Sequence, residues 1–348
     1  MPATVDRDLL RRLPKAELHC HLDGSVRPET LLELAAAYGV AMPAPDADSL
    51  RDYMVVRDAH NLEEYLERFA ITLSVMQTEE ALDRVAYELA EDAAGDGVRY
   101  LEVRFSPVLN VRDGLTLERA VEAPLAGLAR AEREHGVVGR VIVCALRSMT
   151  PDVSLELARL AVAYKRRGVV GFDLAGGEAG NPASRHAPAF FHAREHDLAC
   201  TCHAGEGDGA ASVRQAVHLC GAHRLGHATR LIDDESLTEY VNDRRIALEI
   251  CLTSNVQTRA ARSYAAHPFR EYFDRGLNVV LNTDNRLMSG TTLVDEYAHA
   301  AEQLDFTFEE LSTVALNGFE SAFLPHAERA ELATRARAEI EALKAPVR

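Results

Sequence analysis

The segment AELHCHLDG, residues 16–24, contains two histidines and an aspartate at alternate positions. On a β-strand, alternate side chains point to the same face, so His19, His21 and Asp23 would share one face. Imidazole nitrogens and carboxylate oxygens bind metal ions, and this face could therefore hold a cation. An amphipathic strand with a solvated polar side shows the same spacing, so a metal site requires more ligands from elsewhere in the chain.

Other side chains capable of such chemistry stand where short apolar runs end. They are Ser106 after YLEVRF, Gly176 after VVGFDLA, His203 and Glu206 in ACTCHAGE, His227 in HRLGHAT, and Asp284 and Asn285 in NVVLNTDN. Taken singly, His203 is typical of a buried histidine and Asp284 of a helix N-cap. Taken together, three imidazoles and one carboxylate form a ligand set suited to Zn²⁺, with a further position open to water: His19, His21, His203 and Asp284.

Eight short apolar or β-branched runs, separated by segments of helical periodicity, organise the chain. The runs span residues 16–24, 100–106, 140–148, 169–176, 199–206, 223–229, 246–255 and 278–284. Helical periodicity is clear in LERAVEAPLAGLARAEREH, SLELARLAVAYKRR and APAFFHAREH. This alternation predicts an α/β fold, a (β/α)₈ TIM barrel with a mostly parallel sheet. Active sites of such barrels form at the carboxyl ends of the strands, where the residues above stand.

A long helical segment, residues 45–97, separates the first and second predicted strands. Its apolar residues recur at helical spacing: Leu62, Tyr65, Leu66, Phe69, Leu73 and Met76. A helical insertion here could cap the mouth of the barrel, although a stripe packed on the barrel flank would show the same periodicity. Residues 331–348 predict a closing amphipathic helix. No Gly-, Ser- or Pro-rich linker divides the chain, so we expect a single domain over residues 1–348.

The composition favours a small-molecule ligand. The 348 residues are 47% hydrophobic and carry a formal net charge of −16, which does not suit nucleic acid or an anionic membrane surface. The N-terminal residues lack the apolar core of a secretory signal, and no apolar run reaches the roughly 18 residues of a transmembrane helix, so we expect a cytoplasmic protein. The six cysteines include no CxxC pair and are typical of buried free thiols. The oligomeric state is left open.

Six motifs, taken together, resemble the adenosine deaminase family of the amidohydrolase superfamily. In chain order they are PKAELHCHLDG, GFDLAGGE, CHAGE, RLGHAT, EICLTSNVQT and LNTD. The resemblance implies one catalytic Zn²⁺ bound by His19, His21, His203 and Asp284. Related hydrolases with two metals carry a bridging carboxylated lysine after the fourth strand, where this chain has DLAGG without lysine. A single metal ion is therefore expected.

The resemblance also implies catalytic roles for Glu206, His227 and Asp284. Zinc lowers the pKa of a bound water toward about 7. His227 would orient that water and take up its proton, while Asp284 would accept a hydrogen bond from it. A protonated Glu206 would donate to N1 of the purine and make C6 electrophilic. Attack of water at C6 would give a tetrahedral intermediate that loses ammonia.

The same resemblance assigns substrate contacts. His21 and Asp23 would face the substrate, with Asp23 binding the ribose 5′-hydroxyl, so that HLDG favours a nucleoside over a free base. The backbone N–H of Gly176 would meet N3 of the purine. Asn285 stands where many family members have an acid that contacts N7, and an amide donates there without a change of protonation. Ser106 is a further pocket candidate that could equally cap its strand.

Three hypotheses about function follow. The first is deamination of adenosine and 2′-deoxyadenosine to inosine and 2′-deoxyinosine. The second keeps the chemistry on a 5′-modified adenosine such as 6-aminodeoxyfutalosine, with Arg57 or Arg147 meeting its carboxylate. The third is a non-catalytic barrel that binds a purine nucleoside, which would predict the loss of a metal or acid residue; none is missing. Hydrolysis of an ester or phosphotriester is disfavoured, because the bridging lysine is absent and Glu206 is present.

The chain departs from the frequent motifs of the family at two positions. DLAGGE has Gly177 where DLAGDE is frequent, and NTDNR has Asn285 where NTDDP is frequent.

Overall fold

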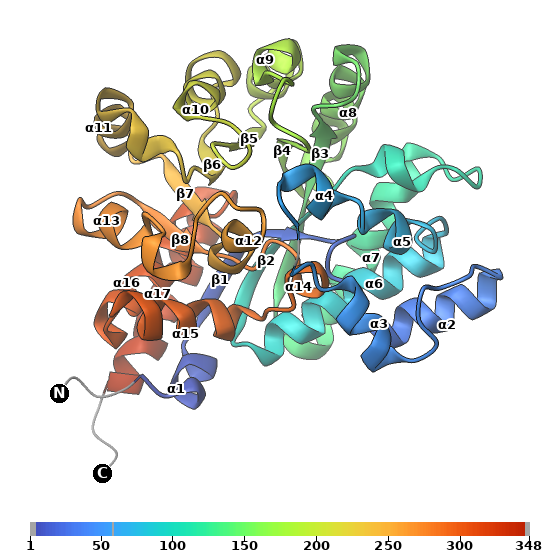
Figure 1. Ribbon diagram of the computed structural model, residues 1–348, viewed down its shortest axis with the longest axis horizontal. Helices are drawn as coiled ribbons and strands as arrows, with labels where there is room; N and C mark the ends of the chain where they lie inside the picture. The colour runs from blue at the N-terminus through green and yellow to red at the C-terminus, as the bar shows by residue number, and fades with distance from the viewer. Residues whose placement is uncertain (1–4, 58, 345–348) are drawn as a thin grey trace.

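Eight parallel strands stand at the centre of the protein and helices surround them (Figure 1). The computed structural model describes residues 5–57 and 59–344. The strands are hydrogen-bonded in the order β1 to β8, each parallel to the next. Their bounds are β1 Lys15–His21, β2 Val98–Phe105, β3 Val138–Leu146, β4 Val169–Ala175, β5 Ala199–Ala204, β6 Arg224–His227, β7 Ala247–Ile250 and β8 Val279–Leu281. This confirms the predicted (β/α)₈ TIM barrel.

The first and last strands meet and nearly close the barrel. The backbone N–H of Asp284 donates to the carbonyl of His19 at 3.0 Å, and that of His21 donates to the carbonyl of Asp284 at 2.7 Å. Nearer the middle of β1, the side-chain oxygen of Asn282 accepts from the backbone N–H of Leu18 at 2.8 Å. Closure at this end places His19 and His21, the predicted ligands on β1, next to Asp284, the predicted ligand that follows β8.

Helices connect the strands and cover the outside of the barrel (Figure 1). The α-helices are α1 Arg7–Arg12, α2 Pro28–Tyr38, α3 Ala47–Met54, α4 Leu62–Leu66, α5 Phe69–Leu73, α6 Glu79–Gly95, α7 Leu117–His135, α8 Pro151–Tyr164, α9 Ala187–Glu195, α10 Ala210–Gln215, α11 Glu235–Asp243, α12 Leu252–Gln257, α13 Phe269–Asp274, α14 Arg286–Ser289, α15 Leu293–Leu304, α16 Phe308–Ser321 and α17 His326–Lys344. Shorter helical turns are η1 Pro107–Asn110, η2 Lys165–Arg167, η3 Ala183–His186, η4 Ala216–Cys220, η5 Leu231–Asp233 and η6 Tyr264–Ala266.

Local capping chemistry defines where several of these helices begin and end. Thr292 and Thr307 start α15 and α16 with capping boxes, in which the threonine and an acid three residues later satisfy each other's backbone N–H groups. Gly136 caps the C-terminal end of α7, and its φ of 73° is the left-handed conformation that glycine adopts without strain. In the described part of the chain, none of the helices combines the length and the apolarity needed to span a lipid bilayer.

The predicted elements agree with the observed ones except at their ends. The seventh predicted strand, residues 246–255, is wrong in its second half, because β7 ends at Ile250 and residues 252–255 belong to α12. The predicted C-terminal helix is α17, although residues 345–348 lie outside the described residues. Residues 45–97 contain α3 to α6, with Asp58 outside the described residues. That this segment is an insertion, and that the chain is one domain, stay predictions.

Candidate active site

Four predicted ligand side chains converge at the carboxyl ends of β1, β5 and β8. Nε2 of His21 lies 3.1 Å from Nε2 of His203, and Oδ1 of Asp284 lies 3.3 Å from Nε2 of both His19 and His21. One ligand atom from each of the four residues lies within 4.8 Å of all the others. The residues come from strands far apart in the sequence, so the barrel itself assembles the set.

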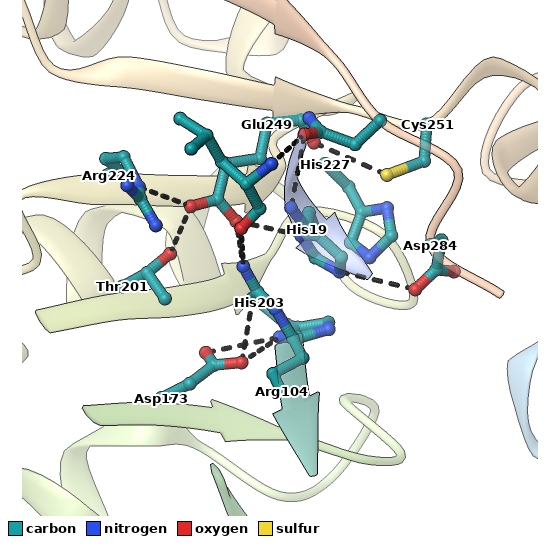
Figure 2. A network of polar contacts seen from close by, with 12 residues as sticks. His19, Arg104, Asp173, Thr201, His203, Arg224, His227, Glu249, Cys251 and Asp284 are labelled. Atoms are coloured by element: carbon teal, nitrogen blue, oxygen red, sulfur yellow. Dashed lines mark hydrogen bonds and ion pairs between the residues drawn. The ribbon is translucent and has the colours of Figure 1, made fainter. Parts of the chain in front are cut away.

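Two buried carboxylates fix the orientation of the imidazole rings (Figure 2). Oε2 of Glu249, on β7, lies 2.8 Å from Nδ1 of His19. Oδ2 of Asp173, on β4, lies 3.1 Å from Nδ1 of His203. Arg104, on β2, donates to both carboxylates at 2.8 Å and joins them. Because each Nδ1 donates to a carboxylate, each Nε2 presents its lone pair toward the centre of the site.

The charges around the site keep these supporting groups ionised and two of the ligand imidazoles neutral. Burial alone would raise the pKa of Asp173, but His203 and Arg104 hold that pKa well below its ordinary value. Arg104 similarly outweighs burial at Glu249, with help from Arg224, and keeps its pKa well below its usual range. Burial lowers the pKa values of His21 and His203. At His19, burial and Arg104 act in the same direction, but the contacts with Asp284 and Glu249 outweigh them and raise the pKa. His21 and His203 are thus neutral acceptors beside ionised carboxylates, the form in which these groups bind a metal.

The four residues fit a metal ion. Nε2 of His19 is buried and makes no hydrogen bond with the described residues, although its ring is held in place from behind. Three converging nitrogen lone pairs and a carboxylate oxygen are a donor set for Zn²⁺ with room for water. The pKa of Asp284 is also held well below its ordinary value, since contacts with His19 and His21 outweigh burial. An ionised carboxylate adds the negative charge that a divalent cation needs.

The backbone at two strand ends adopts an uncommon conformation that aims the side chains inward. His227, the last residue of β6, and Asp284, after β8, both have φ of 62°, in the left-handed region that non-glycine residues rarely occupy. Gly226 precedes His227, and a Cβ there would lie 3.0 Å from Cε1 of His19. The glycine in RLGHAT therefore leaves space for the imidazole of His19 against β6.

Glu206 and His227 face each other beside the ligand set. Oε2 of Glu206 lies 3.4 Å from Nε2 of His227, and one atom from each of these residues lies within 4.8 Å of a carboxylate oxygen of Asp284. Glu206 is buried in the loop that follows β5. The structure thus brings the three residues predicted to be catalytic into one cluster.

A clamp made by Glu178 and Arg147 holds this loop. The carboxylate of Glu178 accepts the backbone N–H groups of residues 205, 206 and 207 at 2.7, 2.9 and 2.7 Å. Arg147 donates to the carbonyl of His203 at 2.7 Å, at the other end of the same segment. Both side chains are buried. The predicted metal ligand His203 and the predicted acid Glu206 are therefore positioned together.

A cavity of about 600 Å³ contains most of the predicted site. The predicted residues that line it are His21, Asp23, Gly176, His203, Glu206, His227, Asp284 and Asn285. Ser106 is buried and does not line the cavity. Burial raises the pKa of Asp23 to about 7. Three of the four predicted metal ligands, the predicted proton donor and the predicted sugar contact thus share one cavity, while His19 is buried and does not line it.

Helices α4 and α5 form an apolar wall of the same cavity. The side chains from these helices that line it include Leu62, Tyr65, Leu66, Phe69 and Leu73. The hydroxyl of Tyr65 lies 2.9 Å from Oγ of Ser289, which ties α4 to the segment after β8. Periodicity left the mouth and the flank of the barrel as alternatives. These five side chains line the cavity, and that the segment caps the mouth stays a prediction. Met76, the sixth residue of the pattern, is buried elsewhere.

Comparison with known proteins agrees with this geometry. The model of the adenosine deaminase family matches residues 14–338. The adenosine deaminase of Mycobacterium avium (strain 104) is 42% identical over 349 residues, covering 94% of this chain and 95% of the relative. The solved structure of an adenine deaminase from Arthrobacter aurescens matches with a TM-score of 0.88 and 30% identity, covering 95% of this chain and 99% of that one.

A second solved structure bears on the metal. An amidohydrolase from Burkholderia ambifaria, solved with bound Zn, matches with a TM-score of 0.88 and 25% identity, covering 99% of this chain and 97% of that chain. The family match spans the barrel and every motif of the site. This chain therefore belongs to the adenosine deaminase family, metal-dependent hydrolases that act on the C–N bond of adenosine-like substrates.

Proposed function

We propose that this protein catalyses the zinc-dependent hydrolytic deamination of adenosine and 2′-deoxyadenosine, with release of ammonia. The observation that carries the proposal is the single cavity that His21, Asp23, His203, Glu206, His227 and Asp284 line together. A metal set, an acid and a carboxylate suited to a sugar hydroxyl are the parts that this reaction needs.

Zinc would be held by His19, His21, His203 and Asp284, and we propose one ion per chain. The support is the convergence of three Nε2 atoms on one carboxylate, and the zinc in the related Burkholderia amidohydrolase. When bound, Zn²⁺ supplies an activated water nucleophile at neutral pH. DLAGG places no lysine after β4 that could bridge a second ion.

Two side chains of this chain would handle the substrate ring and the nucleophile. Glu206, buried in its loop, would hold a proton and donate it to N1 of the purine, which makes C6 electrophilic. His227, whose Nε2 lies 3.4 Å from Oε2 of Glu206, would orient the attacking water toward C6. The apolar wall from α4 and α5 would exclude bulk water from the reacting atoms.

Asp23 would favour a nucleoside over a free base. It lines the cavity, and its buried Oδ1 makes no hydrogen bond with the described residues, so it is available to a ribose 5′-hydroxyl. Gly176, with φ of 91°, would present its backbone N–H to N3. Asn285 would donate its amide to N7. His21 would also touch the substrate from the metal side.

The second candidate is a 5′-modified adenosine whose extension carries a negative charge, such as 6-aminodeoxyfutalosine. Arg112 lines the cavity, and its guanidinium makes no hydrogen bond or ion pair with the described residues. Neither arginine suggested by the sequence takes this place. Arg57 is exposed and lies 3.5 Å from Asp52, while Arg147 is engaged by two backbone carbonyls.

A screen of zinc-loaded protein with four compounds tests the proposal. We expect adenosine and 2′-deoxyadenosine to show the absorbance change of deamination and to release ammonia, with far lower kcat/KM for adenine. A kcat/KM for 6-aminodeoxyfutalosine far above that for adenosine would transfer the assignment to the second candidate. Purine binding without ammonia from any compound would establish a non-catalytic barrel.

We also propose the cytoplasm as the site of this reaction. All six cysteines are buried and free. Free thiols are typical of a reducing compartment.

A further inference from the structure

His227 is held from behind by a chain of buried polar groups outside the cavity. Nδ1 of His227 lies 2.9 Å from Nδ2 of Asn255, on α12. Oδ1 of Asn255 lies 3.0 Å from Nε2 of His267, which follows η6. Nδ1 of His267 receives the backbone N–H of Phe269, the first residue of α13, at 3.0 Å. None of the three side chains is more than 4% exposed, so solvent does not compete for these bonds.

The direction of every hydrogen bond in this series is determined by its last member, the backbone N–H of Phe269. A backbone N–H is always a donor, so Nδ1 of His267 must carry a lone pair. Burial lowers the pKa of His267 to about 3, so its ring is neutral and its single proton is on Nε2. That proton points at Asn255, whose carboxamide oxygen must therefore face His267. The amide NH₂ of Asn255 then faces His227.

We propose that His267 and Asn255 are positioning residues that hold His227 as the neutral tautomer with its proton on Nε2, so that it orients the attacking water by donating a hydrogen bond to it. This inference rests on the proposed deaminase function of the same site. In this tautomer Nδ1 accepts from Asn255, and Nε2, which faces Glu206 and the cavity, has no lone pair.

The opposite tautomer is disfavoured by geometry. A proton on Nδ1 of His227 would face the NH₂ of Asn255 across 2.9 Å, which sets two donors against each other. Rotating the Asn255 amide would move the same conflict to His267, where NH₂ would face Nε2–H across 3.0 Å. Since Nε2 already carries a proton, His227 does not take up the proton of the water in this arrangement. The resemblance to the family implied that second role, and the hydrogen bonds leave His227 the orienting role alone. The carboxylate of Asp284, which by the same resemblance accepts a hydrogen bond from the water, would then receive the proton.

Nitrogen-15 NMR of zinc-loaded protein with labelled histidine tests the inference without any turnover. The chemical shifts and long-range proton couplings of the ring nitrogens distinguish the two neutral tautomers, and the spectrum of His227→Gln identifies the His227 signals among the 14 histidines. We expect wild-type His227 to carry its proton on Nε2. A proton on Nδ1, or a doubly protonated ring at pH 7, would overturn the inference.

Substitution of Asn255 tests whether this residue determines the tautomer of His227. In Asn255→Asp the new carboxylate accepts a proton from Nδ1, so we expect the His227 tautomer to invert while zinc remains at one ion per chain. Asn317→Asp is the matched control, because Nδ2 of Asn317 donates to a carbonyl, that of Val279, away from the cavity. Its spectrum should equal that of the wild type. His267→Phe, which removes the donor to Asn255, should give a mixture of tautomers and serves if Asn255→Asp does not fold.

Kinetics separate this role from a structural one. We expect Asn255→Asp to lower kcat at least about tenfold with KM within about threefold, because orientation of the nucleophile matters to the reacting complex more than to purine binding. An unchanged tautomer in Asn255→Asp, or equal loss of kcat in Asn317→Asp, would contradict the assignment. If adenosine yields no ammonia while His227 shows the Nε2 proton, the proposed substrate is wrong and the tautomer assignment holds.

Discussion

His21 is the last residue of the first strand of the barrel, Asp284 follows the last strand, and two contacts join these residues. The backbone N–H of His21 donates to the carbonyl of Asp284 at 2.7 Å, and Nε2 of His21 lies 3.3 Å from Oδ1 of Asp284. The place where the barrel closes is thus also the place where a metal would be bound. A metal at this position would connect both ends of the sheet. Removal of the metal would therefore also lower the stability of this part of the barrel.

Replacement of His19 tests the ligand set. We expect His19→Ala to lose zinc, since it removes the ring whose Nε2 faces the other donors while Nδ1 is fixed by Glu249. Metal analysis after gel filtration gives the stoichiometry. His299→Ala is the control, because His299 lies half-buried on α15 outside the cavity and outside the groups of residues that could hold a metal, and it should retain one ion. Equal zinc in both variants would show that the ligand set is wrong.

Replacement of Glu206 tests the proton donor. We expect Glu206→Gln to retain zinc and purine binding while kcat falls about 10³-fold, because an amide cannot protonate N1. Asp208→Asn is the control in the same loop, where an exposed carboxylate accepts a backbone N–H from Gly209. Steady-state assays measure kcat, and equilibrium binding of a purine nucleoside measures affinity, so that loss of turnover is separated from loss of binding. Near wild-type turnover in Glu206→Gln would remove this residue from the mechanism.

The strand ends were predictable from sequence because polar residues capable of catalysis stand at the ends of apolar runs. His203, His227 and Asp284 each stand at such an end, and in a parallel barrel the carboxyl ends of all strands lie at one edge. The error over residues 252–255 has a physical cause. The apolar residues of β7 continue through Cys251 and Leu252 before the polar residues of TSN, so hydrophobicity does not mark the change from strand to helix at Ile250.

The supporting residues were harder to find, because they act through contacts between distant strands. Asp173 and Glu249 hold the ligand rings from β4 and β7, and their only signal in the sequence is an acid inside an apolar strand, in GFDLA and ALEI. Arg147 directly follows β3, where a pocket residue would stand. The fold instead directs it to two backbone carbonyls, those of Asn181 and His203.

Replacement of Glu178 tests the clamp on the loop that carries Glu206. In Glu178→Gln an amide NH₂ would meet backbone N–H groups that now donate to a carboxylate, so the loop over residues 205–207 should loosen. We expect kcat to fall about 10- to 100-fold, and faster hydrogen exchange in this segment. Glu310→Gln is the control, since its carboxylate accepts the backbone N–H of Thr307 at a helix start far from the cavity. Equal exchange in both variants would contradict the clamp.

The buried carboxyl group of Glu296 should make the stability of the protein depend on pH, and this group is not one of the predicted metal ligands. Its carboxyl group, on α15, accepts from the backbone N–H of Thr253 at 3.3 Å and from Oγ1 of Thr291 at 2.9 Å. Burial outweighs these bonds and raises the pKa of Glu296 from 4.5 to about 7. Between these pH values the folded protein keeps a proton that the unfolded chain has lost, so stability falls as pH rises through this window.

The variant Glu296→Gln removes this titration while keeping size and hydrogen-bonding capacity. We expect its free energy of unfolding, relative to the wild type, to rise between pH 4.5 and 7 by up to about 3 kcal/mol, the equivalent of the pKa shift. Urea unfolding at several pH values measures the difference. Glu302→Gln, on the exposed side of the same helix, should show no such slope. A constant difference between Glu296→Gln and wild type across this range would mean that Glu296 is ionised in the folded protein and that its neighbours compensate the charge.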